Sequence, residues 1–78
     1  MPTPKQNTRT EEEQRILWEI GNRIGLERKR AGIKSQTMLG ERVGSSQGVV
    51  SDWETGKAEI GVLSLIKLAK TLDISLDV

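Results

Sequence analysis

The feature that most restricts the fold of this chain is a pair of short apolar segments separated by a tight glycine-serine turn that begins at Gly44. In the second segment, Val49, Val50 and Trp53 recur at helical spacing and share one face. Gly44 can take the left-handed conformation that closes many helices, and Ser45 or Ser46 can cap the helix that follows. The sequence therefore predicts two short helices joined by a tight turn.

Helical periodicity continues on both sides of this pair. Thr10 and Glu13 have the spacing of a capping box, which predicts a long first helix that ends before Gly32. A last helix is predicted from about Gly61 to Leu72, and Asp73 lies where a left-handed residue would close it. The residues that these helices are expected to bury are Leu17, Ile20, Ile24, Met38, Leu39, Val43, Val49, Val50, Trp53, Val62, Leu65, Ile66, Leu68, Ala69 and Leu72.

These helices predict an all-α fold of one domain. No segment has the alternation of a β-strand, so we expect a compact bundle of four to five short helices with an extended first helix. Residues 1–9 hold both prolines and almost nothing apolar, and we expect them to form a disordered arm before a domain at 10–78. Ser75, Leu76 and Asp77 have the pattern of an unfinished fifth helix, which predicts that the chain is cut from a longer protein.

The composition excludes several kinds of site. With no cysteine and no histidine, the chain lacks disulfides, thiol chemistry and the usual zinc ligands, and its carboxylates are not arranged as a calcium loop. No carboxylates or lysines converge in a catalytic pattern, so we expect no enzyme, no metal and no cofactor. No segment resembles a membrane span or a signal peptide, which predicts a cytoplasmic protein without a membrane partner.

The candidate functional surface is the helix face opposite the apolar stripe of the second segment. It carries short or flat polar groups, which are Gln47, Gly48, Ser51, Asp52 and Thr55. Protein–protein hot spots are typically rich in aromatic residues and arginine, whereas this face suits the major groove of DNA, where hydrogen bonds distinguish the base edges. Glutamine can pair with N6 and N7 of adenine, and the N-terminus of the preceding helix, with Gln36 in its first turn, is a natural phosphate site.

Several short motifs occur together in a specific order and spacing. They are Arg28, Gly32, Ser35-Gln36, Leu39-Gly40, Val43-Gly44-Ser45, Val50, Trp53-Glu54, Gly56-Lys57 and LIKLAKTLDISLD from Leu65 to Asp77. The run from Ile20 to Asp77 resembles the Cro/cI-type (XRE) helix-turn-helix family of phage and bacterial repressors. The resemblance implies a lambda-repressor-like fold, with the helix-turn-helix unit at about 36–55 and the helix at 46–54 in the major groove.

The resemblance also implies a set of DNA-binding residues. They are Gln36, Ser46, Gln47, Gly48, Asp52, Thr55 and Lys57, and Ser51 is added to them because it lies on the same polar helix face. Gln36 is expected to bind a backbone phosphate and to brace Gln47, while Thr55 and Lys57 contact phosphates beyond the C-terminal end of the recognition helix. Arg28 and Glu54 resemble a partly buried ion pair of the family, with a structural role.

The chain departs from the family pattern in places that affect affinity. Gly40 stands where alanine is usual, which predicts a slightly looser second helix, and the loop before Ser35 is one residue longer than the common form. After the recognition helix, Ala58, Glu59 and Ile60 replace basic residues and a proline. Asp52 is an acidic residue on the helix face that is expected to contact negatively charged DNA. Fewer neutralised phosphates predict weaker binding and a shallower salt dependence.

The resemblance implies a homodimer bound to a palindromic double-stranded operator, acting as a transcriptional repressor or regulator at the nucleoid of a bacterial or phage-infected cell. A second interpretation is a protein-interaction module on the same fold, such as an antitoxin or adaptor. The net charge of +1 and the acidic Asp52 favour it. Trp18 is interpreted as cover for the edge of the core, with contact to a partner as the alternative.

Overall fold

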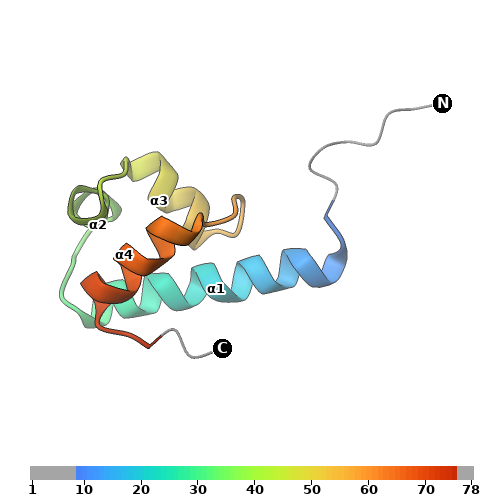
Figure 1. Ribbon diagram of the computed structural model, residues 1–78, viewed down its shortest axis with the longest axis horizontal. Coiled ribbons are helices and arrows are strands. Elements are labelled where there is room, and N and C mark those ends of the chain that lie inside the picture. The colour runs from blue at the N-terminus through green and yellow to red at the C-terminus, as the bar shows by residue number, and fades with distance from the viewer. Residues whose placement is uncertain (1–8, 76–78) are drawn as a thin grey trace.

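A computed structural model describes residues 9–75 of the chain. Within this range it contains α1 (Glu11–Arg30), α2 (Gln36–Val43), α3 (Gln47–Glu54), α4 (Val62–Leu72) and no strand. Figure 1 shows α2, α3 and α4 gathered over the C-terminal half of α1, whose N-terminal half extends past the bundle. The all-α fold class with an extended first helix is confirmed. The predicted arm and fifth helix, apart from Arg9 and Ser75, lie outside the described residues.

The helix ends follow local sequence. In the capping box of α1, the Glu13 N–H donates to Thr10 Oγ1 and the Thr10 N–H donates to Glu13 Oε1, each at 3.0 Å. Ser35 and Ser46 cap α2 and α3, where their hydroxyl oxygens accept backbone N–H groups at 3.1 and 3.2 Å. Gly44, with φ 73°, ends α2 in the left-handed region. The turn between α2 and α3 is therefore determined by residues close together in the chain.

The hydrophobic core lies where the four helices meet. Its buried members are Ile24, Ile33, Leu39, Val43, Val50, Trp53, Leu68 and Leu72. Trp53 was predicted to be a core residue, and the structure confirms it. Ile33 was not predicted, because it lies in the loop between α1 and α2, where no periodicity marks a buried position. It is nonetheless fully buried, and such burial of an isoleucine contributes about 1.5–3 kcal/mol.

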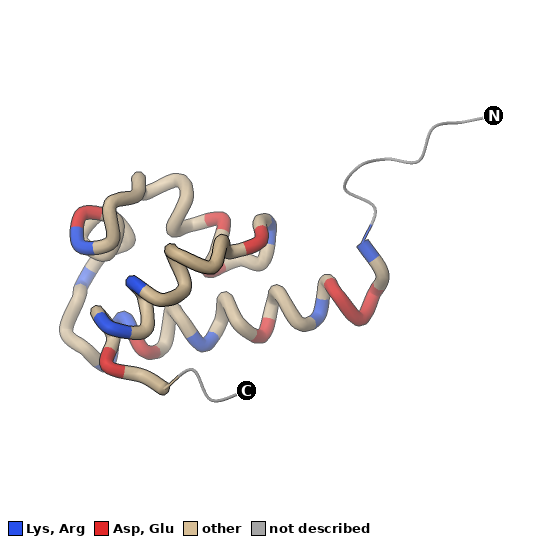
Figure 2. Tube along the Cα trace, viewed as in Figure 1, with Lys and Arg blue, Asp and Glu red and all other residues tan. Residues whose placement is uncertain are grey.

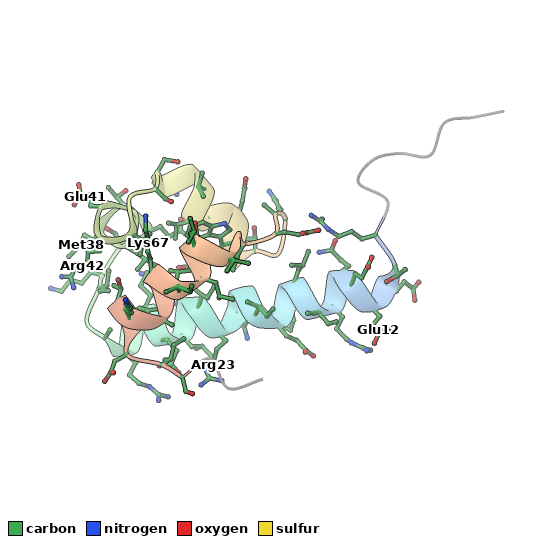
Figure 3. All side chains as sticks on the ribbon, viewed as in Figure 1. Glu12, Arg23, Met38, Glu41, Arg42 and Lys67 are labelled. Atoms are coloured by element: carbon green, nitrogen blue, oxygen red, sulfur yellow. The ribbon has the colours of Figure 1, made fainter. Side chains whose placement is uncertain are left out.

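The sequence analysis predicted more buried apolar residues than the structure contains. Residues expected in the core that are exposed instead are Ile20, Met38, Val49, Val62 and Ile66. Each short helix packs against few neighbours, so only a narrow strip of its surface is covered. Figure 3 shows one case, Met38, on the outer side of α2. Trp18 is 55% exposed and is not part of the buried core, although the Gly56 backbone lies close to the Trp18 backbone.

Two glycines allow backbones to approach closely around α3. A Cβ atom added at Gly21 of α1 would overlap the Trp53 carbonyl oxygen, and one at Gly40 of α2 would lie 2.5 Å from the Ser45 carbonyl oxygen. Gly40 therefore has a packing role, because the absent methyl group lets the turn after α2 pack directly on the helix. These contacts place α3 on top of α1 and α2.

The segment after α3 is attached to the N-terminal half of α1. Gln14 Nε2 donates to the Gly56 carbonyl oxygen at 2.8 Å. Gly56 has φ 76°, and a Cβ there would lie 2.9 Å from Cα of Trp18. The Arg9 guanidinium donates to the Lys57 carbonyl oxygen at 3.5 Å. The extension of α1 thus supports the C-terminal end of α3.

Candidate nucleic-acid interface

The polar face of α3 is open to solvent along its whole length. Of the residues predicted to bind DNA, those exposed are Ser46, Gln47, Gly48, Asp52, Thr55 and Lys57, and those half-buried are Gln36 and Ser51. Val49 is also exposed, although its apolar character assigned it to the core. An exposed valine can contact the methyl group of thymine. The structure therefore gathers the predicted residues on one accessible surface and adds Val49 to them.

No packing contact within the protein requires a glycine at position 48. A Cβ atom at this position would meet only Ser46 Oγ, 4.0 Å away. Glycine in a helix interior costs about 1 kcal/mol relative to alanine, so alanine would make α3 more stable. Gly21 and Gly40 differ in this respect, because backbone atoms occupy the space beside each of them. The empty space at Gly48 therefore suits close approach of a surface from outside the chain.

A chain of hydrogen bonds fixes the orientation of Gln47. Gln47 Nε2 donates to Gln36 Oε1 at 2.7 Å, and Gln36 Nε2 donates to Glu54 Oε1 at 3.1 Å. An ionised carboxylate only accepts, so Glu54 directs the amino group of Gln36 toward itself and leaves the Gln36 oxygen for Gln47. Gln47 then keeps its own oxygen and one N–H for an outside partner. These are the two groups that pair with adenine N6 and N7.

Arg28 joins this chain of hydrogen bonds to α1. Its Nε donates to Glu54 Oε2 at 2.7 Å, and its two terminal nitrogens donate to Glu54 Oε1 and to the Ile33 carbonyl oxygen. The Arg28 and Glu54 side chains are only 8% and 10% exposed. Across residues 9–75, no buried side-chain nitrogen or oxygen lacks a hydrogen-bond partner. The position of Gln47 therefore depends on a bidentate ion pair in the interior of the domain.

The surface around α3 carries few charged side chains. α3 contains Asp52 and Glu54 and no basic residue, and Figure 2 shows that acidic residues on the trace concentrate at the start of α1. The first turns of α2 and α3 carry no acidic residue, so the positive ends of both helix dipoles are free to face phosphates. Lys34 precedes α2 and is exposed. The positive charge at this surface therefore comes mainly from the helix N-termini and exposed lysines.

Thr55 and Lys57, which follow α3, differ in how available their side chains are to a phosphate. The Thr55 hydroxyl donates to the Ser51 carbonyl oxygen at 2.8 Å, so its hydrogen is used within the helix and is turned away from a phosphate. Lys57 is exposed, and among the described residues no carboxylate pairs with it. Arg9 also lies beyond the C-terminal end of α3, where its guanidinium donates to the Lys57 carbonyl oxygen. Sequence reasoning assigned Arg9 to the arm, because its contact partner lies far away in the chain.

The described residues contain neither a metal site nor a membrane-spanning helix. Between residues 9 and 75, no group of three or more acidic, histidine or cysteine side chains could hold a metal ion. No helix in the same range is both long and apolar enough to cross a membrane.

Comparison with known families identifies this arrangement. The profile of the family described as Helix-turn-helix matches residues 24–78, more than half of the chain. The chain belongs to the XRE-type helix-turn-helix family. The match begins within α1 and includes all of α2, α3 and α4, which confirms the resemblance, and a member of this family is a DNA-binding regulator of transcription.

A solved structure supports the same assignment for this XRE-type domain. The crystal structure of the restriction-modification controller protein C.AhdI from Aeromonas hydrophila is similar, with a TM-score of 0.75 and 28% sequence identity. The similarity covers 82% of this chain and 91% of that chain. No curated protein matches the chain by sequence.

Proposed function

We propose that this chain is a sequence-specific transcriptional repressor or regulator that places α3 in the major groove of a palindromic operator. The observation that carries the proposal is the open face of α3, where an oriented glutamine lies beside a glycine that the fold does not need. The setting is the nucleoid of a bacterial or phage-infected cell. Similarity to a restriction-modification controller protein makes the promoters of such genes the first DNA to test.

In this proposal each part of the surface has a separate task. Gln47 pairs with an adenine, and Gly48 lets the groove wall approach the helix backbone. The N-terminus of α2, together with Gln36, binds one phosphate strand, and Lys57 binds the strand on the other side of the groove. A homodimer places two such helices on half-sites about 34 Å apart.

Replacing Gln47 with alanine is expected to weaken binding to the preferred duplex by ~1–3 kcal/mol and to relax discrimination at one base pair. Lys57→Ala is the comparison variant, because a lost phosphate contact weakens binding to all sequences alike and makes the salt dependence shallower. The measurement is fluorescence anisotropy at several salt concentrations, on duplexes chosen by selection from a random pool. Unchanged affinity and preference in Gln47→Ala would show that α3 does not recognise bases.

Replacing Gly48 with alanine is expected to change stability and DNA affinity in opposite directions. The free energy of unfolding should rise by about 1 kcal/mol, because alanine favours a helix and meets only Ser46 Oγ. Affinity for DNA should fall, since the added methyl group occupies space needed by the groove wall. Asn22→Ala on the exposed surface of α1 is the control, and it should raise stability without changing affinity. Equal or tighter DNA binding by Gly48→Ala would remove the proposed reason for the glycine.

A protein-interaction module is the second candidate function. Asp52 on the exposed face and the absence of any basic residue in α3 favour it. A chain of this kind would select no duplex from a random pool even at low salt, where non-specific DNA binding is strongest. Enrichment of a palindromic sequence would exclude it as the main function.

A further inference from the structure

The turn that follows α3 is held by a part of α1 that the family profile does not include. Gln14 Nε2 donates to the Gly56 carbonyl oxygen at 2.8 Å, and this hydrogen bond is partly buried. In Figure 1 the segment after α3 returns beside α1, as this contact requires. Because the profile match begins at residue 24, Gln14 lies outside the helix-turn-helix unit of the family.

Both polar backbone groups of Gly56 are used in this turn. Its N–H donates to the Trp53 carbonyl oxygen at 3.2 Å, and its own carbonyl oxygen accepts from Gln14. A Cβ atom at Gly56 would lie 2.9 Å from Cα of Trp18, so the turn lies directly on the backbone of α1. The backbone that leads into Lys57 is therefore held from α3 on one side and from α1 on the other.

We propose that Gln14 is a positioning residue for DNA binding, which holds the turn at Gly56 so that Lys57 meets a backbone phosphate. The inference rests on the proposed function, in which Lys57 binds one strand. Lys57 is exposed, and between residues 9 and 75 no carboxylate pairs with it. Its side chain loses rotamer freedom when it binds, and a mobile backbone would add a second ordering cost. The hydrogen bond from Gln14 removes that second cost before DNA binds.

Arg9 supports the same turn more weakly. Its guanidinium donates to the Lys57 carbonyl oxygen at 3.5 Å, and its Nε lies 3.9 Å from Glu59 Oε2. The Glu59 side chain is 77% exposed, so its charge would repel a phosphate bound at this turn, and Arg9 reduces that repulsion. An ion pair that is exposed on one side contributes little to stability. Gln14, which makes the shorter hydrogen bond, is therefore the residue to test.

The Gln14→Met variant tests the proposal, because methionine has a similar helix propensity and cannot donate to Gly56. Fluorescence anisotropy should show the dissociation constant for the preferred duplex rise about three- to tenfold, the range that corresponds to one lost hydrogen bond. A non-preferred duplex should lose affinity by the same factor, because phosphate contacts carry no sequence information. Asn22→Met, at an exposed amide of the same helix, is the matched control and should stay within about twofold of wild type.

A double-mutant cycle separates positioning from general stabilisation. In the Lys57→Ala background, Gln14→Met should change the dissociation constant less than about twofold, because the phosphate contact that Gln14 supports is already lost. Nuclear magnetic resonance of the free chain gives a readout without DNA. The order parameter of the Lys57 N–H should fall in Gln14→Met from the rigid range of about 0.85 and stay unchanged in Asn22→Met. Circular dichroism should show that both variants keep wild-type helicity.

Two results would overturn the inference and leave the proposed function standing. One is wild-type affinity in Gln14→Met together with weakened binding in Lys57→Ala. The other is an equal loss of affinity from Gln14→Met with and without Lys57, which would indicate general damage to the domain. A wild-type chain that prefers no duplex over any other would instead overturn the proposed function, and this inference with it.

Discussion

The Glu54→Leu variant is expected to lose about 3–5 kcal/mol of folding free energy, because it leaves the Arg28 charge buried without a partner. Glu54 accepts hydrogen bonds from Arg28 and Gln36, and its side chain is 10% exposed, so little water can replace it. A domain of this size has a total stability of about 5–15 kcal/mol. The variant should therefore unfold at a clearly lower urea concentration than the wild-type chain. Urea denaturation followed by circular dichroism measures the loss.

The double variant Arg28→Met, Glu54→Leu tests whether the loss of stability in Glu54→Leu comes from the unpaired Arg28 charge. Replacing both charges with apolar side chains removes the unpaired charge, so the double variant should be more stable than Glu54→Leu alone. Glu19→Ala, at an exposed position of α1, should change stability by no more than about 0.5 kcal/mol. If Glu54→Leu were as stable as Glu19→Ala, the ion pair would have no role in holding α1 against α3.

The Gly21→Ala variant should lose about 2–3 kcal/mol of stability, although alanine favours a helix by about 1 kcal/mol over glycine. The added methyl group would overlap the Trp53 carbonyl oxygen and lie 2.9 Å from the backbone of Glu54, so α1 and α3 would have to move apart. DNA affinity should fall as well, because α3 carries the proposed recognition residues. Thermal unfolding and fluorescence anisotropy on the same samples measure the two effects.

Gly25→Ala provides the matched control for this variant, one turn further along the same helix. A Cβ at Gly25 meets a side-chain oxygen of Glu54 at 3.3 Å, and no backbone atom of α3 lies close to it. Its stability should therefore stay within about 1 kcal/mol of wild type, since the gain in helix propensity offsets a small adjustment of the carboxylate. Equal stability of the two alanine variants would contradict close backbone contact at Gly21.

The buried ion pair and the proposed recognition surface are connected through Glu54. Glu54 holds Arg28 in the interior and, through Gln36, determines which way the amide of Gln47 points. We therefore expect substitutions at Glu54 that preserve folding to change base preference as well. This connection gives the ion pair a consequence at the proposed DNA surface, even though both charged side chains are buried.

Much of the architecture could be predicted from the sequence, and the errors share one cause. The capping box at Thr10, the serine caps and the left-handed Gly44 and Asp73 were predictable, because each acts on backbone groups a few residues away. The exposed Val49 and the buried Ile33 were not, because helical periodicity records only a preference for one face. It carries no information on which neighbours will cover that face.

The sequence alone determined where the helices start and stop and which polar residues lie on α3, since capping and helical spacing are short-range effects. Only the tertiary structure decided how closely α1 approaches α3 at Gly21, and how the glutamines connect to Arg28. It also decided which apolar residues of α1 and α4 remain uncovered. The hydrogen bonds that connect the glutamines to Glu54 and Arg28 join residues 11 to 26 positions apart, and their geometry exists only after the helices have packed.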